Sequence, residues 1–86
     1  MTAKELQKYF KDHLVPSRLY KMKGGHHKNR ICLGWDKNRQ EWEVYYSEGK
    51  AKIGLMQFDN ESEACQCMKE EVSTVMELIY GLKIVS

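Results

Sequence analysis

Three segments of alternating apolar residues, joined by two tight turns, place the strongest constraint on the fold of this chain. They lie within ICLGWDKNRQEWEVYYSEGKAKIGLMQF, residues 31–58. Apolar residues at every second position are typical of strands with one buried face. The turns at 37–40 and 47–50 are too short to hold a crossover helix, so consecutive strands must run in opposite directions. The sequence therefore predicts a three-stranded antiparallel meander.

The last of these strands, residues 51–58, changes its alternation halfway along. Ile53 and Leu55 fit one face, whereas Met56 and Phe58 fit the other. Either a bulge shifts the register here or both faces of the strand are partly covered.

A helix is expected before the meander. Thr2 followed by Glu5 fits a capping box, and apolar residues then recur at helical spacing, which predicts a helix over residues 3–13. Its apolar stripe consists of Leu6, Tyr9, Phe10 and His13. Residues 17–29 are expected to form a long irregular connection, with a turn at the Gly24-Gly25 pair.

A second helix is expected after the meander. Asp59 or Asn60 can cap it, Asn60 with Glu63 also resembles a capping box, and Gly81 is a suitable C-terminal stop. A helix over residues 61–80 would be about 30 Å long, enough to cover a three-stranded sheet. Its apolar face consists of Cys65, Met68, Val72, Val75 and Ile79.

Together these elements predict one α+β domain over residues 1–86, with the order α-β-β-β-α and both helices on one face of a three-stranded antiparallel sheet. At 42% hydrophobic and 30% charged, the composition is that of a globular domain. No apolar run approaches the ~20 residues that span a bilayer. The N-terminal stretch has no apolar signal core, so we expect a cytoplasmic protein. Its three cysteines are then expected to be reduced.

Catalytic and metal-binding signatures are missing from the sequence. There is no nucleophile elbow, phosphate-binding loop or dinucleotide fingerprint. Cys32 lies in the middle of a strand and Cys65 on the apolar face of a helix, where cysteine is usually a small buried hydrophobe. His26 and His27 are adjacent, and no second ligand pair stands at zinc-binding spacing. We therefore expect no enzymatic activity, no cofactor and no metal.

The charges are unevenly spread along the chain. Residues 1–30 carry eight Lys or Arg against two acids, whereas residues 59–86 carry two against six. The basic connection could neutralise phosphates, and its tyrosine could stack on a base, which makes nucleic-acid binding the alternative function. The candidate contacts are Arg18, Tyr20, Lys21, Lys23, Lys28 and Arg30. No recognisable nucleic-acid-binding module accompanies them, so this reading ranks second.

Two surfaces are candidates for binding another protein. Glu63, Glu70 and Glu77 are spaced seven apart on the second helix and form an acidic stripe that could attract a basic partner. The outer face of the sheet is expected to mix adaptable apolar groups with charges, as protein interfaces do. Its candidate contacts are Glu43, Tyr45, Lys52 and Met56, beside Cys32 and Gly34.

Part of the chain resembles small bacterial immunity proteins of polymorphic-toxin and contact-dependent growth-inhibition loci. The resemblance covers residues 14 to about 68 and rests on WEVYYSE at 42–48, Gly49, and FDNESEAC at 58–65. In that family the turn at Glu48-Gly49 is expected to hold one more residue, often Arg, so this hairpin is tighter. The resemblance implies a cytoplasmic antidote that binds the C-terminal domain of one secreted toxin, often a nuclease, and blocks its active site or a neighbouring surface.

The predicted function is therefore neutralisation of a cognate toxin domain by binding, without catalysis. The alternative is a small nucleic-acid-binding regulator that uses the connection over residues 18–30. The two differ in their response to salt, because binding to phosphates weakens steeply as salt rises, whereas a complex with an apolar centre is less sensitive.

Overall fold

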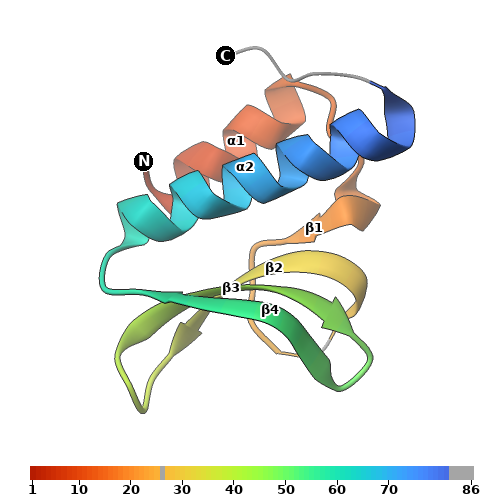
Figure 1. Cartoon of the computed structure of the whole chain (residues 1–86). Coiled ribbons are helices and arrows are strands. Elements are labelled where there is room, and N and C mark those ends of the chain that lie inside the picture. The colour runs from red at the N-terminus through yellow and green to blue at the C-terminus, as the bar shows by residue number, and fades with distance from the viewer. Residues whose placement is uncertain (26, 82–86) are drawn as a thin grey trace.

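Two helices lie on one face of a four-stranded sheet (Figure 1). The computed structural model describes residues 1–25 and 27–81. The sheet has the order β1-β2-β3-β4. The elements are α1 (Ala3–Asp12), a 3-10 turn η1 (Ser17–Leu19), β1 (Tyr20–Lys21), β2 (Lys28–Asp36), β3 (Glu41–Glu48), β4 (Ala51–Phe58) and α2 (Glu61–Tyr80).

The α+β class is confirmed, but the prediction of three antiparallel strands is wrong. The antiparallel meander β2-β3-β4 is present, and β1 adds a fourth strand that pairs with β2 in parallel, Tyr20 opposite Ile31 and Lys21 opposite Cys32. A strand of two residues is too short to show an alternating pattern, which is why the sequence did not reveal it. The sheet is therefore mixed.

Both helices begin and end where local signals direct them. The Thr2 side chain accepts a bond from the backbone N–H of Glu5, and the Glu5 carboxylate accepts one from the N–H of Thr2, at 3.2 and 2.8 Å. Asn60 caps α2 through the N–H of Glu63 at 2.8 Å, and Gly81 ends α2 with φ +66°. Glycine adopts this left-handed conformation without steric cost.

The core lies between the helices and the inner face of the sheet. It is formed by Leu6, Phe10, Val15, Tyr20, Ile31, Leu33, Val44, Ala64, Cys65, Met68, Val72 and Met76. Of the apolar face predicted for α2, the first half is fully buried, Val75 is half-buried, and Ile79 is 61% exposed. The last turns of α2 therefore extend past the core.

A bulge in β4 explains the change of alternation in its sequence. Val44 pairs with Met56 and Tyr46 with Ile53, so two residues of β4 stand opposite the single residue Tyr45. The extra residue is accommodated at Gly54, whose φ is +64°. Paired residues share a face of the sheet, so Met56 lies on the helix side. The prediction that Met56 belongs to the outer face is wrong, and of the two explanations the bulge is correct.

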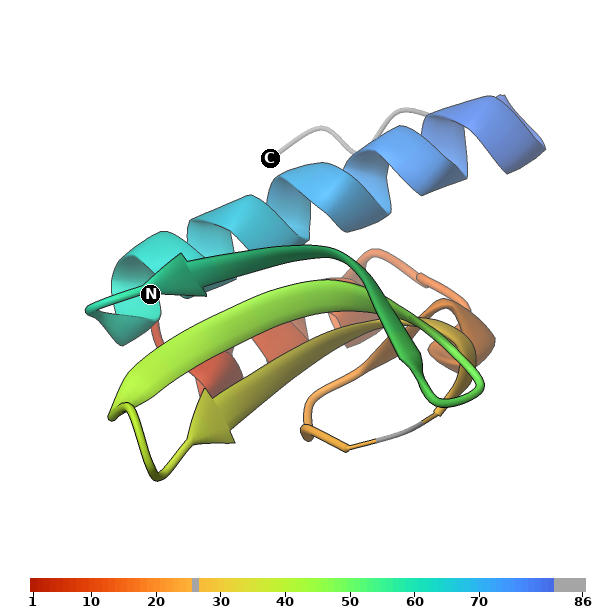
Figure 2. The same ribbon diagram turned by 60° about the horizontal axis from the view of Figure 1, so that its bottom comes forward.

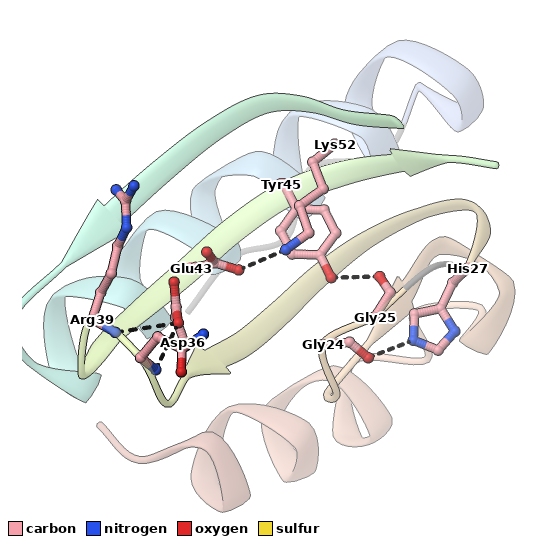
Figure 3. Close-up of polar contacts among 9 residues, drawn as sticks. Gly24, Gly25, His27, Asp36, Arg39, Glu43, Tyr45 and Lys52 are labelled. Atoms are coloured by element: carbon pink, nitrogen blue, oxygen red, sulfur yellow. Dashed lines mark hydrogen bonds and ion pairs between the residues drawn. The ribbon is translucent and has the colours of Figure 1, made fainter. Parts of the chain in front are cut away.

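The connection between β1 and β2 covers part of the outer face of the sheet, over β2 and β3. Gly24 packs directly on Gly34, where an added Cβ would lie 2.8 Å from the Gly24 Cα. The Tyr45 hydroxyl donates to the Gly25 carbonyl at 2.6 Å (Figure 3), and the His27 N–H donates to the Ser47 Oγ at 2.8 Å. This connection works as a strap, which we define as residues 22–25 and 27.

Candidate functional site

Most of the contact surface predicted on the outer sheet face is not open. Tyr45, beneath the strap, is 1% exposed, and Glu43 is 6% exposed. Lys52 donates to the Glu43 carboxylate at 3.0 Å and lies 4.8 Å from the centre of the Tyr45 ring (Figure 3). Because Glu43 and Tyr45 are buried, neither is available as a free interface, whereas Lys52 remains exposed. Met56 lies on the opposite face, with its Sδ 3.7 Å from the Sγ of Cys67.

The acidic stripe of α2, in contrast, is exposed as the sequence predicts. Glu63, Glu70 and Glu77 are all exposed. Glu63 accepts a bond from the Asn60 amide at 3.0 Å, and Glu70 accepts one from the Gln66 amide at 3.1 Å. No ion pair within the described residues involves any of the three. Their charges are therefore directed at solvent.

The candidate nucleic-acid contacts of the basic connection lie in different surroundings and do not form one surface. Tyr20 is buried against Phe10, with the ring centres 4.7 Å apart, so the expectation that Tyr20 stacks on a base is wrong. Lys21, Lys23 and Arg30 line a surface hollow beside β1 with Lys11 of α1. Arg18 and Lys28 line a different hollow, which Arg30 also borders.

The cysteines and histidines have structural surroundings. Burial raises the pKa of the Cys32, Cys65 and Cys67 thiols, that of Cys65 to about 11. A nucleophilic cysteine needs the opposite shift. The His27 Nε2 lies 3.0 Å from the Gly24 carbonyl oxygen, within the strap, and His26 lies outside the described residues. Among residues 1–25 and 27–81, no three metal-ligating side chains gather.

A groove between α2 and the β3–β4 hairpin is a surface feature that the sequence did not reveal. In Figure 1, α2 and β4 are close where the chain joins them and separate toward the end of the helix. Two adjoining hollows of about 260 and 370 Å³ lie in this gap, and both are bordered by Ile31, Tyr46 and Val75. The larger, near η1, is also bordered by Ile79, and the smaller by Ile53 and Met56.

Several of the side chains that border this groove are apolar and accessible. Ile53 is 47% exposed, Tyr46 38% and Met56 37%. Leu78 and Tyr80, the neighbours of Ile79 in α2, are exposed as well. One signal in the sequence does point to it: Leu78, Ile79 and Tyr80 are consecutive in a helix, so no single core can cover all three. The depth of the groove depends on the twist of the sheet, which the residue pattern does not specify.

Two further observations concern membrane-spanning helices and similarity to known proteins. Within the described residues, no helix is both long enough and apolar enough to cross a bilayer. Comparison with protein-family models, with curated proteins and with solved structures finds no match.

Proposed function

We propose that this chain is a cytoplasmic immunity protein that binds the C-terminal domain of a cognate secreted toxin. Binding blocks the active site of the toxin or a surface beside it, and the chain itself performs no catalysis. The observation that carries this proposal is the accessible apolar groove between α2 and the β3–β4 hairpin. A contiguous apolar surface on a small domain commonly marks an interface with another protein.

The acidic stripe supplies the second half of the proposed mechanism. Many toxins of the proposed class are nucleases, whose clefts are basic because they bind phosphates. The solvent-directed carboxylates of Glu63, Glu70 and Glu77 would attract such a cleft and speed its capture. In this arrangement the groove supplies most of the affinity, whereas the stripe supplies rate and selectivity.

Co-expression with the toxin domain tests the proposal. The candidate toxin is the C-terminal domain of a large secreted protein encoded directly upstream, and the readouts are cell survival and co-purification. We expect rescue and a stable complex. Reversing Glu63, Glu70 and Glu77 to Lys should slow complex formation, whereas Asp12→Lys, an exposed charge reversal on α1 away from the groove, serves as the matched control. A toxin that kills cells despite abundant folded antidote would contradict the proposal.

Nucleic-acid binding is the second candidate function, supported by the hollow beside β1. Lys11, Lys21, Lys23 and Arg30 all line it, and no acidic residue among those described does. Because Tyr20 is buried in the core, such binding would rest on phosphate contacts alone. It should therefore weaken steeply with salt and show little sequence preference. Titration of single-stranded RNA at two salt concentrations separates this function from the first.

A further inference from the structure

The groove between α2 and the β3–β4 hairpin differs in charge from one end to the other. At the end near η1 it is bordered by Arg18, Lys28 and Arg30, with no acidic residue among the described residues that line it. At the opposite end it is bordered by one acid, Glu71 of α2. Between these ends the floor is apolar and is formed by Ile31, Tyr46 and Val75.

A bulge and a hydrogen bond place two of these cations, Lys28 and Arg18, at this end. Asn29 adopts a left-handed conformation, φ +52°, at a bulge in β2 that leaves Lys28 opposite Glu48 and Arg30 opposite Ser47. Paired residues share a face, so the bulge turns Lys28 to the helix side, where Tyr46 also lies. Arg18 is held at the rim because its guanidinium donates to the Tyr80 hydroxyl at the end of α2. Bulges that redirect a side chain are frequent beside functional sites.

We infer that this groove binds a segment of a partner protein in which aliphatic side chains are followed by acidic ones. The aliphatic side chains would cover Tyr46, Ile53 and Ile79, and the carboxylates would pair with Lys28 and Arg18 at the rim. The inference rests on the proposed function only in that the partner is a protein. It assigns the apolar anchor of the interface to the groove, a different surface from the acidic stripe.

The apolar floor distinguishes a protein segment from other anionic ligands. A phosphate or a nucleic-acid backbone would use the cations and leave the half-exposed Ile53 and Tyr46 uncovered. A protein segment can contact both the cations and the apolar floor, because interfaces combine a desolvated apolar centre with a charged rim. Complementary charges at the rim also fix the direction in which the segment lies.

Selection from a phage-displayed library of random short peptides on the full chain tests the inference without knowledge of the partner. We expect the enriched peptides to combine aliphatic with acidic residues. Ile79→Ser and Lys28→Glu should each weaken their binding by about tenfold, the effect of losing one well-placed contact. Lys4→Glu reverses an exposed charge on α1 away from the groove and should leave binding unchanged. Because Lys4, Lys28 and Ile79 are exposed, all three variants should fold, which thermal unfolding verifies.

Several outcomes would overturn the inference. They are a lack of enrichment, enriched peptides without acidic residues, and enriched peptides that bind both groove variants as tightly as the unaltered chain. Self-association that Ile79→Ser abolishes would identify a second copy as the occupant, and salt-sensitive binding of RNA that Lys28→Glu abolishes would identify a nucleic acid.

The toxin experiment tests the proposed function separately from the groove. If peptides bind through the groove but the chain does not rescue cells from the toxin, the groove is a binding site and the toxin is not the partner. If rescue is unaffected by both Ile79→Ser and Lys28→Glu, the toxin is the partner and the groove is not its binding site.

Discussion

At the scale of single residues, the close contact of two glycine backbones holds the strap against the sheet. A Cβ at position 34 would lie 2.8 Å from the Gly24 Cα and 3.3 Å from its N. Backbone atoms cannot turn away as a side chain can, so Gly34→Ala must lift the strap. We expect a loss of about 1–3 kcal/mol in the free energy of unfolding, measured with urea.

The reciprocal substitution gives this prediction its control. A Cβ at position 24 would lie 3.3 Å from the Gly34 Cα, a separation that a small shift can relieve. Gly24→Ala should therefore cost clearly less than Gly34→Ala. Equal stability of Gly34→Ala and the unaltered chain would show that the strap is not tightly packed there.

The hydroxyl of Tyr45 provides the second attachment of the strap. It donates to the Gly25 carbonyl at 2.6 Å, and the ring is otherwise buried. Tyr45→Phe removes this bond, retains the ring, and should lower the free energy of unfolding by ~1 kcal/mol. Hydrogen exchange should quicken at the strap residues. The neighbouring Tyr46→Phe removes an exposed phenol and is the matched control; an equal loss of stability in both variants would contradict the assignment.

At the scale of elements, residue patterns predicted the helices and the meander but not what covers the sheet. The capping residues and helical spacing predicted α1 to within one residue and α2 over its full length. The strap was missed because Met22 to Gly25 show no periodicity, and its attachment depends on contacts with distant residues. This is why Glu43 and Tyr45, which alternate like solvent-facing residues, were wrongly assigned to an open surface.

The bulge in β4 is an element-scale feature with a testable backbone requirement. Gly54 has φ +64°, and no atom lies within 4 Å of where its Cβ would be. Any cost of substitution must therefore come from the left-handed backbone and not from crowding. We expect Gly54→Ala to lower the free energy of unfolding by ~1–2 kcal/mol.

Asparagine separates this backbone effect from other causes. Asn enters the left-handed region more readily than Ala does, so Gly54→Asn should cost less, although its side chain is larger. Gln57→Ala, at an exposed position in the same strand, should have little effect. If Asn cost more than Ala, the size of the side chain would be the cause, and the open space around Gly54 would be in doubt.

At the scale of the whole molecule, the sheet carries two layers of buried groups, one on each face. The helices cover the apolar inner face, and the strap lies against part of the outer face (Figure 2). On the outer face Cys32, Glu43, Tyr45 and Ser47 are buried. Sequence patterns predict the first layer because its periodicity is regular. The groove lies where the first layer ends, since α2 and the twisted sheet diverge, and no residue pattern specifies the angle between them.

Because thiols and phenols are buried in both layers, the free energy of unfolding depends on pH in the alkaline range. Burial raises the pKa of Cys65 from 9.0 to about 11, and that of Tyr45 from 10.0 to about 12, with the nearby Cys32 and Glu43 adding to the shift of Tyr45. The folded chain thus holds these protons more tightly than the unfolded chain does. The stability that they contribute is complete below the unfolded values and is lost as pH rises through the folded ones.

The free energy of unfolding should therefore fall as pH rises from 9 toward 12, the interval between the unfolded and folded pKa values of these groups. Urea midpoints across this range, under reducing conditions, measure the slope. Cys65→Ala and Tyr45→Phe each remove one titrating group and should flatten it, even though both lower stability at neutral pH. Val72→Ala, a substitution in the same buried layer as Cys65, should lower the midpoint by the same amount at every pH. If Cys65→Ala kept the full slope, ionisation of the buried thiol would not be what opens the fold in alkali, and solvent would already reach the layer between α2 and the sheet.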